Sequence, residues 1–136
     1  MKQKIENSKI LETAIELVAN AHSTIQMTMN AKEEIENPLP DGYFQLLQTK
    51  MDAGVRVTRI GFGTSREFEP IRDRVMFENL NYSFIRTSLR DYRRILLIDG
   101  RKLLFVDTTN GKRQVFYSEE PSLISQFTTY LTAHTS

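Results

Sequence analysis

Cysteine is absent from the 136 residues, and histidine occurs only twice, at His22 and His134. The first absence excludes disulfides, thiol catalysis and thiolate metal sites, and the second argues against a histidine-rich metal site. Long apolar runs are lacking too, so no segment is long enough to cross a membrane. The opening residues, MKQKIENSK, lack the apolar core of a signal peptide. We therefore expect a cytoplasmic protein that uses neither a metal nor a cofactor.

The composition is that of a folded protein, with 40% hydrophobic and 26% charged residues, and the length predicts a single domain over residues 1–136. The net charge of +1 is unevenly distributed. Residues 56–113 hold all 11 arginines and 2 lysines against 7 acidic residues, which gives +6, whereas residues 1–55 hold 5 lysines against 8 acidic residues, which gives −3. A basic centre suits an anionic ligand or nucleic acid. The alternative is a solvated face paired with the acidic N-terminal part.

Apolar spacing predicts three helices and one mixed segment. The first helix runs from a cap at Asn7 or Ser8 to about His22, and the second covers residues 43–53. The last helix opens at Pro121. Residues 66–79 are expected to be helical only in part, because Pro70 must lie in the first turn or break the helix.

Strand patterns fill the intervals between these helices. Period-two alternation or β-branched runs predict strands over residues 23–29, 55–62, 82–85, 94–99, 102–107 and 113–118. The last three strands are joined at Asp99-Gly100 and Asn110-Gly111, both strong hairpin signals. The order α-β-α-β-(α)-β-β-β-β-α predicts an α/β fold with a mixed sheet flanked by helices.

Residues 91–107, DYRRILLIDGRKLLFVD, form the most informative stretch. Its apolar residues are expected to be the core of a hairpin, which leaves the charged residues unexplained. The order of elements, together with AGVRVTRI at 53–60 and the IDG turn, resembles one half of the phospholipase D superfamily fold. Aligned on Asp99, that family's His-x-Lys-x4-Asp motif places Arg94 at the lysine and Tyr92 at the histidine. The family's Gly-Ser-x-Asn falls at residues 106–109.

The departures from this motif decide the expected chemistry. Catalysis in the family needs an imidazole nucleophile, and Tyr92 replaces it with a phenol whose ordinary pKa is about 10. The chain is therefore more similar to a non-catalytic branch, the TrmB-type transcriptional regulators of archaea, whose phospholipase D-like domain takes part in effector sensing and dimerisation. SQFTTYL (125–131) matches the closing helix of that branch.

This resemblance implies a non-enzymatic sensing or dimerisation domain that forms a homodimer, with Tyr92, Arg93 and Arg94 near the seam or lining a pocket for a small anionic or polar effector. A winged helix does not fit before Lys9, so DNA would be reached only indirectly, through a separate winged-helix part. Two alternatives stay open. One is a phosphodiesterase or nuclease of the same superfamily, and the other is a nucleic-acid-binding module that uses the basic centre.

Two further groups of residues are candidates for a site. GFGTSRE (61–67) is a glycine-rich turn before a helix, where Thr64, Ser65 and Arg66, together with Asn30 at another strand end, could bind an anion. The alternative is a plain turn capped by Thr64 or Ser65. Arg59 shares a strand face with Val55 and Val57, so we expect it to point inward and to pair either with Asp99 or Asp107 or with an anionic ligand.

Overall fold

The computed structural model describes residues 2–70, 83–87 and 92–135. Within these ranges seven strands form one mixed sheet in the order β1-β7-β6-β5-β2-β3-β4. The strands are β1 (Lys2–Ile5), β2 (Thr24–Asn30), β3 (Arg56–Phe62), β4 (Ser83–Thr87), β5 (Ile95–Ile98), β6 (Lys102–Thr109) and β7 (Lys112–Ser118). The predicted class, a mixed sheet flanked by helices, is confirmed. The segment predicted to be partly helical, 66–79, falls largely outside the described residues.

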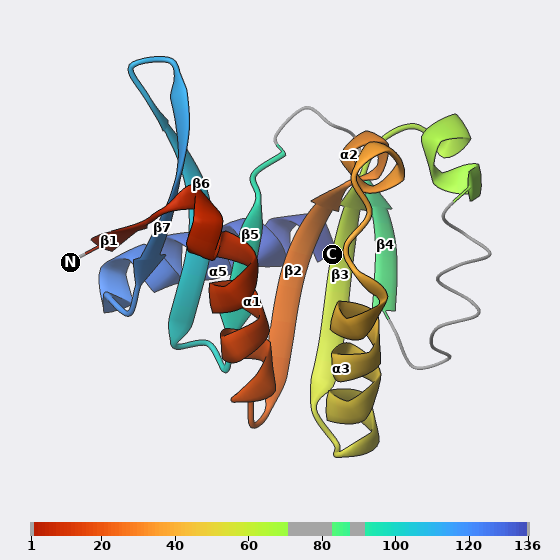
Figure 1. The fold of residues 1–136 in the computed structure, drawn as a ribbon, viewed down its shortest axis with the longest axis horizontal. Coiled ribbons are helices and arrows are strands. Elements are labelled where there is room, and N and C mark those ends of the chain that lie inside the picture. The colour runs from red at the N-terminus through yellow and green to blue at the C-terminus, as the bar shows by residue number, and fades with distance from the viewer. Residues whose placement is uncertain (1, 71–82, 88–91, 136) are drawn as a thin grey trace.

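Helices cover both faces of this sheet (Figure 1). After the short turn η1 (Asn7–Lys9), the helices are α1 (Ile10–Ala19), α2 (Ala31–Glu36), α3 (Asp41–Asp52) and α5 (Pro121–Thr135). One core cluster joins α1 and α3 to the sheet through Val18, Leu47 and Val57, and another joins α5 to the opposite face through Leu131, Phe127 and Leu97. Successive residues of β5 and of β6 therefore alternate between the two cores, as the period of two requires.

Two elements were not predicted from the sequence. β1 pairs antiparallel with β7 and reads KQKI, an edge strand whose first three side chains are polar and exposed. α2 is a six-residue helix with the sequence AKEEIE, and it begins directly where β2 ends. The Asn30 side chain caps α2, since its Oδ1 accepts from the N–H groups of Lys32 and Glu33 at 3.0 and 3.3 Å. Asn30 therefore holds a helix end in place.

The two hairpin turns have the backbone that the sequence predicted. Asp99 and Gly100 have φ of 55° and 64°, and Asn110 and Gly111 have φ of 54° and 76°. Two consecutive left-handed residues define the turn that matches the twist of a two-residue hairpin. Within the described ranges, none of the helices combines the length and apolarity that crossing a membrane requires.

Candidate functional site

The strand register brings most candidate residues to one edge of the sheet. β2 and β3 run parallel, with Asn30 opposite Phe62, and β5 runs antiparallel to β2. The end of β2, the end of β3 and the start of β5 therefore lie at the same edge, which we call the motif edge because Tyr92 and Arg94 precede β5 there. Asp99 follows β5 and lies at the opposite edge.

Thr28 fixes the backbone at the start of β5. Its hydroxyl donates to the carbonyl of Arg93 at 2.5 Å and accepts from the N–H of Ile95 at 2.9 Å. On the other side, the N–H of Val106 donates to the carbonyl of Arg94 at 3.1 Å. The segment aligned with the second family motif, 106–109, is thus a direct backbone neighbour of Arg94.

The Arg94 side chain ends on a carboxylate of α2. Its Nη1 lies 3.2 Å from Glu33 Oε2, while Arg113, from β7, places its Nη1 3.5 Å from Glu33 Oε1. The Arg94 and Arg113 side chains are 51% and 58% exposed, and Glu33 is 36% exposed. Exposed pairs of this kind contribute only about 0–1 kcal/mol, so solvent or a ligand can replace the carboxylate.

Tyr92 is held by aromatic packing. Its ring meets Phe62 edge-on, with centroids 5.2 Å apart. Its hydroxyl is buried, and no residue of the described chain hydrogen-bonds to it. Burial raises the pKa of Tyr92 to about 12, and the nearby Arg94 offsets only part of that rise. The phenol therefore stays protonated at neutral pH.

His134 lies closer to the motif edge than its sequence position indicated. It packs on Phe62 and Tyr130, with ring centroids 5.0 and 4.6 Å apart, and Phe62 is also the ring that Tyr92 contacts. The Tyr130 hydroxyl accepts from the N–H of Arg93 at 2.9 Å. Sequence reasoning missed this residue, although His134 continues the helical series of Phe127 and Tyr130 that faces the sheet.

Arg59 points inward as expected, but its carboxylate partner is Glu34. The Arg59 Nη2 and Glu34 Oε1 are 3.3 Å apart, with side chains only 2% and 8% exposed. The guanidinium also lies over the ring of Phe44, 5.4 Å from its centroid. The partners proposed from the sequence, Asp99 and Asp107, are therefore wrong, because the unpredicted helix α2 brings a nearer carboxylate to β3.

Both aspartates have other contacts. Asp99 accepts hydrogen bonds from the N–H groups of His22, Ser23 and Thr24, the shortest at 2.7 Å, and from the Ser23 hydroxyl. Burial raises the pKa of Asp99, but these hydrogen bonds outweigh it and lower the pKa to about 2. Asp107 forms an exposed pair with Lys2 at 3.4 Å. Asp99, the residue on which the motif was aligned, thus joins the loop before β2 to the hairpin.

The glycine-rich turn satisfies its own backbone. The N–H of Thr64 donates to Glu67 Oε1 at 2.8 Å, and the N–H of Glu67 donates to the Thr64 hydroxyl at 3.2 Å. This reciprocal capping box leaves the Thr64 amide occupied, and Ser65 and Arg66 are exposed on the helix that follows. The geometry matches the capped-turn alternative. Gly63 is required there for close approach, since a Cβ would lie 2.8 Å from the Ala31 Cβ.

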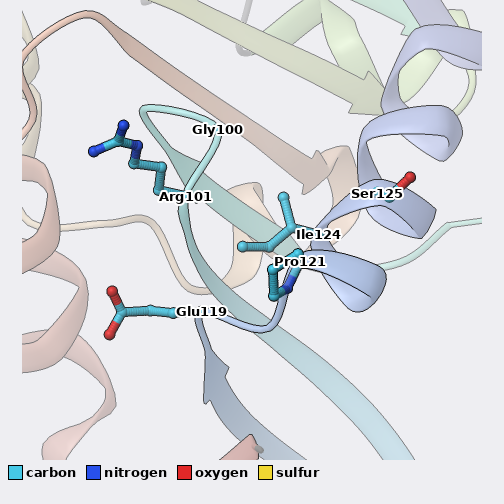
Figure 2. A pocket seen from close by; sticks show the side chains of 6 residues that line it. All are labelled: Gly100, Arg101, Glu119, Pro121, Ile124 and Ser125. Carbon is cyan, nitrogen blue, oxygen red and sulfur yellow. The ribbon is translucent and has the colours of Figure 1, made fainter.

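An open pocket of about 430 Å³ lies elsewhere, between the β5–β6 turn and the start of α5 (Figure 2). Its lining residues are Gly100, Arg101, Glu119, Pro121, Ile124 and Ser125, and none of the candidate site residues is among them. It is separated from Tyr92 and Arg94 by the length of β5. Across the described part of the chain, no three His, Asp or Glu side chains gather as metal ligands would.

Comparison with known proteins identifies the fold. No protein-family model matches the chain, and no curated protein matches it in sequence. TrmBL2, an archaeal chromatin protein whose structure shows a novel mode of DNA binding, superposes with a TM-score of 0.70 at 9% identity, over 98% of this chain and 50% of its own. Polyphosphate kinase from Porphyromonas gingivalis gives a TM-score of 0.65 at 10% identity, over 98% of this chain and 26% of its own.

These likenesses define a TrmB-like or phospholipase D-like fold. This chain spans half the length of TrmBL2 and about a quarter of the kinase. One neighbour is a chromatin protein and the other an enzyme, so the fold alone does not fix the function.

Proposed function

We propose that this chain is a non-catalytic ligand-sensing and dimerisation domain of a transcriptional regulator. The observation that carries the proposal is the state of the motif residues. Tyr92 stands at the nucleophile position. Its hydroxyl is buried and its pKa is raised to about 12, whereas nucleophilic catalysis needs an activated group. Activation requires an adjacent base or a lowered pKa, and the packing of Tyr92 has the opposite effect.

The other motif residues are engaged in contacts within the chain. Arg94 binds Glu33, and Asp99 binds three backbone N–H groups. The nearest imidazole, His134, packs against Phe62 and Tyr130 as one ring of an aromatic cluster. This arrangement favours a site that binds a ligand over one that breaks a bond.

Hydrolysis of a generic phosphodiester, bis(4-nitrophenyl) phosphate, tests the proposal. The purified chain should release no nitrophenol above the buffer rate, and Arg94→Ala should behave in the same way. Release that is clearly above that rate and disappears in Arg94→Ala would instead support the phosphodiesterase alternative.

The dimer is a second part of the same proposal. Its support is the family resemblance, in which the motif regions of two copies meet, and the exposure of Arg93 and Arg94 at the motif edge. Size-exclusion chromatography with light scattering should give twice the 15.8 kDa chain mass. A monomer at all concentrations would refute dimerisation.

Direct nucleic-acid binding is a second candidate function. It is favoured by the fold shared with TrmBL2 and by the exposed Lys112 and Arg113 in the β6–β7 hairpin, which extends beyond the sheet in Figure 1. Duplex affinity that falls steeply with salt, and that weakens in Arg113→Gln, would support this function. The sensing proposal expects no such affinity for this chain.

A further inference from the structure

Three charged side chains from different elements meet at the motif edge. Glu33 of α2 lies between Arg94, which precedes β5, and Arg113 of β7, with one carboxylate oxygen near each guanidinium at 3.2 and 3.5 Å. Two positive charges therefore share one negative charge, and the group carries a net charge of +1. All three side chains are at least 36% exposed, so the carboxylate can rotate into solvent without moving the backbone.

The hydroxyl of Tyr92 belongs to the same group. It is buried and has no hydrogen-bond partner in the described chain. Tyr92 stands two residues before Arg94, just ahead of β5. Burial has the largest effect on the pKa of this hydroxyl, and the charges of Arg94, Glu33 and Arg113 act on it in addition. A buried hydroxyl without a partner costs stability, so a ligand that brings an acceptor to it gains a hydrogen bond that the chain alone does not make.

We propose that Arg94, Arg113 and the Tyr92 hydroxyl form a binding site for a dianionic phosphate group, and that Glu33 occupies this site as an internal gate when no ligand is bound. The inference rests on the proposed sensing function and names its ligand class and its regulation. Guanidinium forks match phosphate oxygens geometrically, and the Tyr92 O–H supplies a third donor.

The gate selects for charge. Glu33 is tethered next to the arginines, and a short tether gives a group an effective concentration in the millimolar range or above. A free monocarboxylate carries the same charge as Glu33, so it would bind the two arginines no more strongly than Glu33 does and would not displace it. A phosphate dianion neutralises both arginines and accepts the third hydrogen bond, so it can displace Glu33.

α2 stays in place when the gate opens. The next residue, Glu34, is buried against Arg59 at 3.3 Å, and Asn30 caps the helix N-terminus. One carboxylate of α2 therefore anchors the helix, while its neighbour is free to leave the site. When phosphate replaces Glu33, only the Glu33 side chain moves. Its contacts with Arg94 and with Arg113 of the β6–β7 hairpin are then lost.

Titration calorimetry with inorganic phosphate, at constant ionic strength, tests the gate. Glu33→Gln removes the competing charge and should bind phosphate about tenfold more tightly than the wild type. Arg113→Gln and Tyr92→Phe should each weaken binding. The matched control is Glu36→Gln, which removes the same charge from an exposed position of the same helix. Its affinity should stay within about twofold of the wild type.

The outcomes separate the two proposals. Equal affinity in Glu33→Gln and the wild type, or an equal gain in Glu33→Gln and Glu36→Gln, overturns the gate, and the sensing function then stands or falls on the hydrolysis assay alone. A tenfold gain in Glu33→Gln together with phosphodiester hydrolysis would keep the gate and refute the non-catalytic function. A parallel titration with glycerol phosphate distinguishes the two possible ligands. Tighter binding of glycerol phosphate than of inorganic phosphate indicates that the ligand is a phosphorylated small molecule, and equal binding indicates phosphate itself. Both results support the site.

Discussion

Replacing Asp99 with asparagine should destabilise the protein because it removes one hydrogen-bonded carboxylate. Asp99 accepts from the N–H groups of His22, Ser23 and Thr24 and thereby fixes the loop that leads into β2. Its φ of 55° is left-handed, a conformation that asparagine tolerates as well as aspartate does. Asn110 shows this directly, with a φ of 54° in the corresponding turn of the next hairpin. Asp99→Asn therefore changes the charge and keeps the turn.

The magnitude follows from the pKa of the carboxyl, which is lowered from 3.8 to about 2 in the folded chain. A shift of that size corresponds at most to about 2.5 kcal/mol, and partial exposure of the carboxylate reduces it to about 1 kcal/mol. The amide oxygen of asparagine keeps some of the hydrogen bonds, but its NH2 group faces donors. We expect a loss of about 1–2 kcal/mol in the free energy of unfolding at pH 7.

The pH dependence of the stability loss shows whether the missing carboxylate causes it or whether the substitution disturbs the fold in a general way. Because the folded pKa is depressed, the stabilisation is complete above the unfolded value of 3.8 and is lost as pH falls through about 2. The difference in free energy of unfolding between wild type and Asp99→Asn, measured in urea, should be the same at pH 7 and pH 5. At pH 3 it should fall to about half of that value. Asn110→Asp, the matched control, should change stability by less than about 0.5 kcal/mol. A difference that does not depend on pH would refute the reasoning.

Three other predictions concern the residues around the motif edge. Glu34→Gln removes the negative charge beside the buried Arg59 and should lower the free energy of unfolding in urea by about 3–5 kcal/mol. The double variant Glu34→Leu with Arg59→Met should recover most of this loss. A Glu34→Gln protein as stable as the wild type would contradict a buried ion pair. Gly63→Ala places a Cβ 2.8 Å from that of Ala31 and should lower the free energy of unfolding by about 1–3 kcal/mol. The loss should be smaller in an Ala31→Gly background. Equal losses in both backgrounds would show that this contact is not the cause. Tyr92→Phe removes a buried hydroxyl without a partner, so its melting temperature should stay equal or rise while its phosphate affinity falls; a fall in both would mean that the hydroxyl stabilises the fold.

Local patterns predicted the elements whose apolar residues follow a regular period. α5 shows this, since Ile124, Phe127 and Leu131 face the sheet as their spacing indicates. The Asp99-Gly100 and Asn110-Gly111 turns were predictable because two left-handed residues in succession need these residue types. β1 and α2 were missed because neither has an apolar period that a sequence can display: one is an exposed edge strand, and the other has only six residues.

The site was less predictable than the fold because its contacts depend on α2. AKEEIE resembles a solvated charged segment, yet it places Glu33 on Arg94 and buries Glu34 against Arg59. Once α2 was missed, the carboxylate partner of Arg59 had to be sought among more distant aspartates. The candidates Arg94 and Tyr92 did fall at one edge, since strand order alone determines which strand ends meet there.

Phosphorus NMR of the full chain with a small phosphodiester and a small phosphomonoester in one sample tests most directly whether this site binds phosphate without cleaving an ester. The non-catalytic account predicts that the monoester resonance broadens or shifts with protein, more in Glu33→Gln than in the wild type, while the diester resonance keeps its full intensity. Growth of a monoester product from the diester, abolished by Arg94→Ala, would contradict it.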